Sequence, residues 1–278
     1  MKIVKVINNN TVCVVDDNGL EQIVLGKGIG FSKKAGDTVS REQIQKVYII
    51  GDTGLRKRMI NCLAEIPYEY IKLTDSLVEY IKSHIKDKLN ESLIVTLSDH
   101  IGFAIERKKQ GMEILNPLMN SIRNSFPEEL SLGYYCVDRI KEEIGVELHP
   151  DEAGFIAMHI VSARLSTDLS KVHGLTSIIN GCMNIIDTVY CGKIDKNTLA
   201  YEQLSTFIKE LAQRVLNNQT IPVVLARDED YKMTVEKEFP IAHKCAKCIQ
   251  DFILKNYKKS VSCDDVLLLT LFIRIAAG

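Results

Sequence analysis

One change of pattern near Gly51 limits the folds open to this chain. Before Gly51, short runs of β-branched residues alternate with turn clusters, as in small antiparallel strands. After it, apolar residues recur at spacings of three and four up to the C-terminal end, as in amphipathic helices. The chain has only six Pro and 16 Gly in 278 residues, which favours long helices over a many-stranded fold. We therefore predict a multidomain protein with a small β domain followed by an all-α region.

The β part contains four predicted strands, at residues 2–7, 11–15, 22–25 and 46–50. The run Asp16-Asp17-Asn18-Gly19 predicts a hairpin turn, because Asn-Gly readily supplies positive φ angles. A glycine-rich loop at residues 26–31 follows the third strand. Since four strands bury only a small core, we expect this four-stranded antiparallel domain to be stabilised by dimerisation.

The helical part divides into two similar blocks, residues 65–168 and 172–278. The segment 97–101 aligns with 204–208, and a second alignment places residues 151–152 against 264–265. Such repetition predicts two copies of one helical-bundle domain, with His100 matching Phe207 and His159 matching Phe272. Breaks in the helical pattern fall near Asn90, Asn116-Pro117, Phe126-Pro127, His149-Pro150, Asp168–Gly174, Tyr190–Asn197, Asn217–Pro222 and Asn256–Ser262.

Charge is distributed unevenly between these parts. Residues 1–58 hold ten Lys and Arg against six Asp and Glu, whereas residues 59–278 hold 25 against 30. This distribution indicates that only the β head meets a polyanion. No apolar run approaches the roughly 20 residues of a membrane span, and residues 1–5 lack the long apolar stretch that a signal peptide would show. Eight scattered Cys favour a reducing compartment, so we expect a cytoplasmic protein.

The head carries residue types suited to RNA. Asparagine side chains offer donors and acceptors to base edges, phenylalanine a stacking face, and lysines a charge for phosphates. Glycines let a backbone approach closely. From spacing alone, a hairpin with solvated lysines is an equally good interpretation. The loop is no dinucleotide-binding fingerprint, because its glycines at 26, 28 and 30 lack the G-x-G-x-x-G spacing.

His100 and His159 occupy equivalent places on predicted apolar helix faces. An isolated histidine there is usually a core residue satisfied by one hydrogen bond. However, Phe207 and Phe272 fill both matching places in the second block, so the position tolerates a side chain without nitrogen. A neutral imidazole can accept a phosphoryl group, which adds about −1.5 to −2 of charge. On a half-buried apolar face that charge is costly, and we predict a phosphorylation switch rather than catalysis.

Other candidates are weaker. Cys245-Ala246-Lys247-Cys248, with His243 nearby, resembles half of a metal or redox site, but i, i+3 spacing on a helix is ordinary packing and no second pair exists. We expect His84, His149 and His173 to be surface or cap residues, and residues 227–230 to be a solvated loop. The sequence contains no Walker loop and no nucleophile elbow. We therefore predict no catalytic residue, no metal and no cofactor.

The head resembles the co-antiterminator RNA-binding domain of the BglG/SacY family of transcriptional antiterminators, through KIVKVINNNTVCVV and LGKGIGFSKKAGD. The segments LSDHIGFAIER and PDEAGFIAMHIVSA resemble the histidine sites of that family's phosphotransferase-system regulation domains. The resemblance covers essentially the whole chain. It implies an RNA-binding domain at 1–55 and regulation domains at 65–168 and 172–278. It also implies that paired heads bind an antiterminator hairpin in leader mRNA, so that transcription continues into sugar-utilisation genes.

The resemblance also assigns residues. The implied RNA contacts are Lys5, Asn8, Asn10, Gly26, Lys27, Gly28 and Phe31. The implied phosphate acceptors are His100 and His159, modified by a sugar-specific enzyme II permease when its sugar is absent, which inactivates the protein.

Two departures from the family pattern stand out. Lys27 replaces the usual Arg, so one expected RNA contact lacks the planar, multi-donor guanidinium group. Phe207 and Phe272 replace histidines that the carrier HPr phosphorylates in the family. We predict that control by HPr is lost and that these phenylalanines hold a permanent dimer interface.

Two other classes of function compete with an RNA-binding antiterminator. A phosphotransfer component would pass phosphate onward from His100 or His159, but it needs an exposed histidine and no nucleic-acid head. A DNA-binding regulator needs a recognition helix, whereas the head is predicted to be β. We favour the antiterminator, which is not an enzyme.

Overall fold

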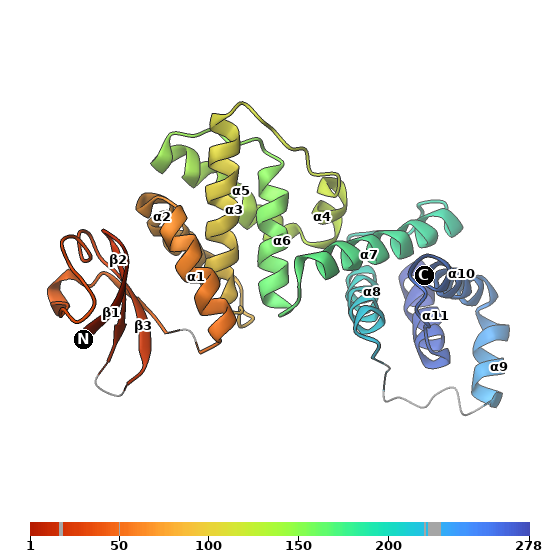
Figure 1. Cartoon of the computed structure of the whole chain (residues 1–278). Helices are drawn as coiled ribbons and strands as arrows, with labels where there is room; N and C mark the ends of the chain where they lie inside the picture. Colours follow the sequence, from red (N-terminus) through yellow and green to blue (C-terminus); the bar gives the residue numbers. More distant parts are fainter. Residues whose placement is uncertain (17–18, 50, 220, 222–228) are drawn as a thin grey trace. The chain divides into compact units, whose positions relative to one another are not determined.

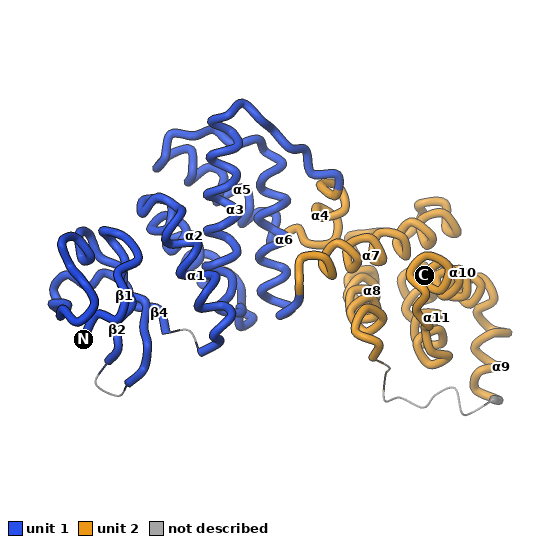
Figure 2. The backbone as a smooth tube through the Cα atoms, viewed as in Figure 1, with its two compact units in different colours: residues 1–117, 128–167 blue, residues 118–127, 168–278 orange. Residues whose placement is uncertain are grey.

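The computed structural model describes residues 1–16, 19–49, 51–219, 221 and 229–278 (Figure 1). It contains a four-stranded antiparallel sheet followed by helices, which confirms the predicted fold class. The chain forms two compact units (Figure 2). The first consists of residues 1–117 and 128–167, and the second of residues 118–127 and 168–278.

The sheet has the strand order β1-β2-β3-β4. Each strand pairs with the next in antiparallel fashion, so consecutive hairpins build the whole sheet. The predicted strands agree with those observed to within one residue, except that the fourth is shorter than expected. Of the predicted hairpin turn, Asp17 and Asn18 lie outside the described residues, while Gly19 has the positive φ of 80° that the turn requires. The bounds are β1 (Lys2–Asn8), β2 (Thr11–Val15), β3 (Glu21–Leu25) and β4 (Lys46–Tyr48).

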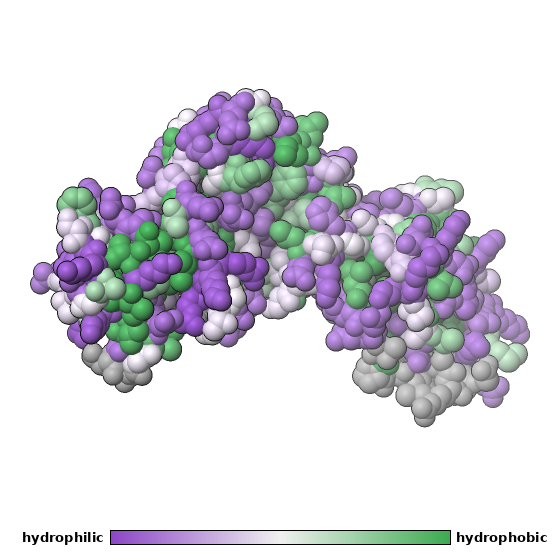
Figure 3. All heavy atoms as spheres, viewed as in Figure 1, coloured by the Kyte–Doolittle hydropathy of each residue, from purple (hydrophilic) through white to green (hydrophobic). Residues whose placement is uncertain are grey.

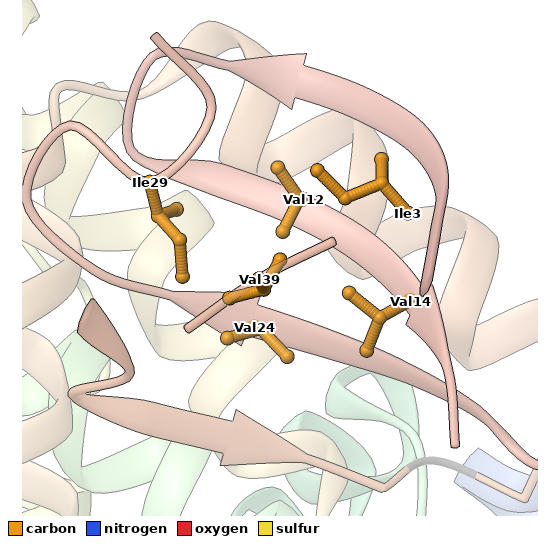
Figure 4. Close-up of a cluster of buried hydrophobic side chains, with 6 residues drawn as sticks. All are labelled: Ile3, Val12, Val14, Val24, Ile29 and Val39. Atoms are coloured by element: carbon orange, nitrogen blue, oxygen red, sulfur yellow. The ribbon is translucent and has the colours of Figure 1, made fainter. Parts of the chain in front are cut away.

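One face of the sheet carries the core of the head (Figure 4). Its six buried side chains are Ile3, Val12, Val14, Val24, Ile29 and Val39. Ile29 belongs to the glycine-rich loop and is fully buried, so this loop is fastened to the core. A Cβ at Gly26 would lie 2.0 Å from the Gln43 carbonyl oxygen, which makes glycine necessary at that point. Gln43 ends the short 3-10 helix η1 (Arg41–Gln43) before β4.

Helix α1 packs against both β1 and α3. The side chain of Asp52 caps it by accepting a hydrogen bond from the Leu55 N–H at 2.5 Å. The sequence pattern did not separate α1 from α2; the chain breaks at Ile66-Pro67, because a proline cannot continue the preceding helix. The bounds are α1 (Thr53–Glu65), α2 (Tyr68–His84), α3 (Ser92–Lys109), α5 (Pro127–Ile144) and α6 (Glu152–Arg164).

All regular secondary structure in the described residues of the second unit is helical. The break predicted at Asp168–Gly174 is wrong in its C-terminal part, because α7 begins at Leu169 and includes Gly174. A Cβ at Gly174 would meet the Leu216 side chain at an ordinary 3.5 Å, so this glycine does not mark a turn. Helix α4 packs against α7, although residues 118–127 fall within the predicted interval 65–168. The bounds are α4 (Met119–Ser125), α7 (Leu169–Val189), α8 (Leu199–Asn217), α9 (Glu229–Glu238), α10 (Pro240–Tyr257) and α11 (Cys263–Ala277).

The visible surface is mostly hydrophilic, with smaller hydrophobic groups scattered over it (Figure 3). Large apolar side chains that are exposed include Phe31, Phe103 and Leu115. Within the described ranges, none of the helices has the length and apolar character required to cross a bilayer.

Candidate nucleic-acid interface and histidine pair

The turn between β1 and β2 meets the glycine-rich loop at one end of the sheet. The Gly28 N–H donates to the Asn10 side-chain oxygen at 2.8 Å, and the Gly26 N–H donates to the Asn10 carbonyl at 3.0 Å. The Gly30 N–H donates to the Asn9 carbonyl, also at 3.0 Å. These bonds bring together residues that are 16 to 21 positions apart in the sequence, so most of the predicted contact residues share one edge of the head.

The two asparagines at this edge differ in which side-chain hydrogen-bonding groups remain unused. Asn10 uses its side-chain oxygen on Gly28, while its NH₂ group donates no hydrogen bond to the described residues. Asn8 accepts from the Asn10 N–H at 2.8 Å and donates to the Leu63 carbonyl of α1 at 2.6 Å. Asn10 therefore offers a donor to a base edge, whereas Asn8 supports the turn and ties the head to α1.

Phe31 is the most prominent apolar side chain of the loop. It is 67% exposed, and its N–H donates to the Gly28 carbonyl at 3.0 Å, which fixes the backbone below it. Gly28 has a φ of 69°, a conformation that glycine adopts without strain. Lys5 and Lys27 are exposed as well. A rigid loop with an exposed ring and lysines can stack a base and meet phosphates.

In the helical part of the first unit, His100 of α3 and His159 of α6 face each other. Their ring centroids are 5.0 Å apart, with the planes inclined at 43°. His159 is 8% exposed, and burial lowers its pKa to about 3, with the nearby His100 contributing in the same direction. Its imidazole is therefore neutral at physiological pH.

A buried carboxylate completes this site. Glu152, in the first turn of α6, places Oε2 3.1 Å from His100 Nε2, while its Oε1 forms an ion pair with Arg107 Nη2. The Glu152 side chain is only 4% exposed. Sequence reasoning gave Glu152 a role at the helix N-terminus and missed Arg107. A signal was present, because Arg107 and Glu152 recur as Arg214 and Asp265 at the two offsets of the repeat.

The second unit repeats this geometry without imidazoles. Phe207 and Phe272 stack at 4.8 Å with an interplanar angle of 27°, and Arg214 Nη2 lies 2.9 Å from Asp265 Oδ1. The stacking takes place within one chain, and Phe207 is only 7% exposed. The predicted role of these phenylalanines in holding two copies together stays a prediction.

The residues that resembled half of a metal or redox site do not come together in one cluster. Cys245 is buried and Cys248 exposed on α10, and burial raises the pKa of Cys245 to about 12. His243 Nε2 lies 3.3 Å from a Glu236 carboxylate oxygen. Across the described ranges, no group of three or more His, Cys, Asp or Glu could hold a metal ion.

The other predicted surface and cap residues follow the expected pattern. His84 and His173 are exposed, and His149 Nδ1 accepts from the Asp151 N–H just before α6. Arg227 and Asp228, from the predicted solvated loop, lie outside the described residues.

Comparison with known families agrees with this division of the chain. Residues 1–57 match the model of the CAT RNA binding domain, and residues 75–163 and 180–276 each match that of the PRD domain. The double match confirms the internal repeat.

Two curated relatives match along nearly their whole length. One is "Transcription antiterminator LicT" of Bacillus subtilis, 33% identical over 273 residues, covering 98% of both chains. The other is "Beta-glucoside operon antiterminator" of Dickeya chrysanthemi, 33% identical over 98% of this chain and 95% of its own. Among solved structures, "Crystal structure of GlcT CAT-PRDI" is 32% identical with a TM-score of 0.51, covering 59% of this chain and 97% of that one. This chain therefore belongs to the BglG/SacY family of transcriptional antiterminators, in which a CAT RNA-binding domain precedes PRD regulation domains.

Proposed function

We propose that this chain is a sugar-responsive antiterminator that binds a hairpin of leader mRNA and prevents the overlapping terminator from forming. The family assignment supports the process, and the edge of the head supports the class of ligand. The main supporting observation is that Phe31 is 67% exposed on the loop whose Gly28 N–H donates to the Asn10 side-chain oxygen. An exposed ring and a hydrogen-bond donor on the same edge of the head suit unpaired bases, which are the usual target of sequence-specific RNA recognition.

The proposed contacts are Lys5, Asn8, Asn10, Gly26, Lys27, Gly28 and Phe31. Because Asn8 already uses its side-chain oxygen and one amide bond within the protein, its contribution requires release from Leu63 or acts through the turn. We propose three domains, at 1–55, 65–168 and 172–278, a cytoplasmic location, and a homodimer as the RNA-binding form. The small head core, a cluster of six buried apolar side chains, supports dimerisation.

Regulation in this proposal occurs at His100 and His159, phosphorylated by a sugar-specific enzyme II permease. The phosphate would arrive beside the buried Glu152 carboxylate, which lies 3.1 Å from His100 Nε2. Two unit charges of like sign about 7 Å apart, as for a phosphate on the remote ring nitrogen, repel by about 2 kcal/mol at an effective dielectric constant of about 20. A dianion therefore disfavours the packing of α3 on α6 by several kcal/mol, enough to shift the population of conformations. Phe207 and Phe272 offer no nitrogen, so HPr is not proposed as a regulator.

A gel-shift assay tests the ligand. The full chain should bind a leader-RNA hairpin more tightly than duplex DNA of the same sequence, and tighter binding to DNA would favour a DNA-binding regulator. The variant H100A should give antitermination without inducer in a reporter strain. A stably folded but inactive variant would contradict the inhibitory role of His100. Rapid transfer of phosphate from the chain to another protein would favour a phosphotransfer component.

A further inference from the structure

The proposed function leaves one buried charge beside the phosphate acceptor unexplained. Glu152 is 4% exposed, and its two oxygens contact different partners of α3. One oxygen pairs with Arg107, and the other lies 3.1 Å from His100 Nε2, a close contact that does not have the geometry of a hydrogen bond. His100 Nε2 is itself buried, so the 15% exposure of this side chain comes from its other atoms.

The Glu152 carboxylate influences which of the two ring nitrogens of His100 carries the proton. A neutral imidazole has one N–H and one lone pair. A lone pair on Nε2 would lie 3.1 Å from the carboxylate oxygen and the two would repel. With a proton on Nε2, the electrostatic interaction with the carboxylate becomes attractive. Arg107 compensates the carboxylate charge on its other side, so the proton need not move to Glu152. The Nε2–H form of His100 is therefore favoured, and its lone pair lies on Nδ1.

We propose that Glu152 is a positioning residue that holds the proton of His100 on Nε2 and thereby directs phosphoryl transfer to Nδ1. The proposal rests on the proposed function in that His100 is taken as the acceptor. In the step, the Nδ1 lone pair attacks phosphorus and an Nδ1–P bond forms. The bond between phosphorus and the donor's leaving group breaks, and its electron pair departs with that group. The proton on Nε2 stays beside Glu152.

The same observations distinguish the two histidines. His159 Nδ1 is buried and has no hydrogen-bond partner within the described part of the chain. No Asp or Glu oxygen of that part lies within ion-pair distance of His159. His100 thus has a carboxylate beside its ring and a side chain that is 15% exposed, whereas His159 has no such carboxylate and is 8% exposed. His100 is the primary acceptor in this proposal.

The second unit supplies a matched control. Asp265 pairs with Arg214 as Glu152 pairs with Arg107, but Phe207 stands where the histidine would be. Asp265 also caps α11 through Ser262, so an acid at this position has a structural role independent of phosphorylation. The test must therefore measure something that a purely structural acid would not change, namely the nitrogen that becomes phosphorylated.

The experiment treats the full-length wild type, E152Q, E152D and D265N with potassium phosphoramidate at pH 8, where ammonia is the leaving group. Peptide mapping locates the label, and ³¹P NMR distinguishes Nδ1-phosphohistidine from Nε2-phosphohistidine. In the wild type and D265N, the label on His100 should lie on Nδ1. In E152Q the amide can donate to Nε2 and favour the other tautomer, so the Nδ1 label should fall at least about tenfold or move to Nε2. E152D, which keeps the charge, should retain part of the Nδ1 label.

A second measurement needs no substitution. In wild-type protein containing ¹⁵N-histidine, the ring nitrogen shifts of His100 should report a protonated Nε2. A protonated Nδ1, a wild-type label on Nε2, or an E152Q product identical to the wild type would overturn the proposal while leaving His100 as the acceptor. Absence of any label on His100 would overturn both this proposal and the proposed phosphorylation.

Discussion

Replacing His159 with phenylalanine should remove a specific part of the pH dependence of stability. The second unit carries Phe272 at the matching position, stacked on Phe207, so this helix packing accommodates the ring. In the folded protein burial lowers the pKa of His159 to about 3, whereas in the unfolded chain it is about 6.5. Below pH 6.5 the unfolded chain therefore binds a proton that the folded chain does not.

The magnitude follows from this difference in proton binding. Above the unfolded-state pKa both states hold neutral His159, and this residue makes no pH-dependent contribution. As the pH falls from about 6.5 towards 3, the unfolded state is stabilised by about 1.4 kcal/mol per pH unit. Between pH 7.5 and 5.5, His159 alone should lower the free energy of unfolding of the first unit by about 1.4 kcal/mol. In H159F this loss should be absent.

Urea denaturation followed by circular dichroism, at pH 7.5 and 5.5, measures the effect. The quantity of interest is the change with pH in the wild type minus that in H159F, because the other titrating groups contribute to both. H84F is a suitable control, since His84 is exposed at the end of α2 and its replacement should leave the difference near zero. Equal pH dependence in the wild type and H159F would refute a buried neutral His159.

Three further substitutions test other parts of the chain. F31A should weaken binding of the leader hairpin roughly 5- to 150-fold in a filter-binding assay, because one stacked base is worth about 1–3 kcal/mol. The melting temperature of the F31A protein should equal that of the wild type. G133A should destabilise the first unit by about 1–3 kcal/mol in urea, because its Cβ would lie 2.1 Å from a carbonyl oxygen of α6, whereas G51A, which meets no atom within 4 Å, should not. R214M should lower the free energy of unfolding by about 3–5 kcal/mol, because it leaves the buried Asp265 carboxylate without its arginine. A loss below about 1 kcal/mol, measured by calorimetry, would show that stability does not depend on this ion pair.

Local patterns predicted the fold well, because local interactions set the elements. The β-branched run Thr11–Val15 and the turn residues around it define β1, β2 and β3 nearly to the residue. The failures concern helix boundaries. A break was predicted over Asp168–Gly174, yet α7 begins at Leu169 and continues through Gly174, because packing on α8 outweighs weak helix propensity there.

The histidine site was predicted in part. The sequence placed His100 and His159 in equivalent helical settings of one block, and the structure brings their ring centroids to 5.0 Å. The Arg107–Glu152 pair escaped prediction because its members are 45 residues apart on different helices, and no local spacing connects them. The bond from Asn8 to Leu63, across 55 residues, was missed for the same reason. Such contacts depend on how helices pack, which a single sequence does not encode as a short-range pattern.

The two helical units keep the same buried acid–arginine pair but place different rings beside it. Since the pair persists in the second unit beside Phe207, its shared role is to join the helices, and only the ring decides whether a charge can be added next to it. A phenyl ring accepts no phosphate, so the acid of the second unit never meets a second negative charge from this position. Under the proposed function, the chain therefore responds to one input, through the first unit. Replacing Phe207 with histidine would then restore an acceptor nitrogen beside Asp265 on a scaffold that already holds the acid.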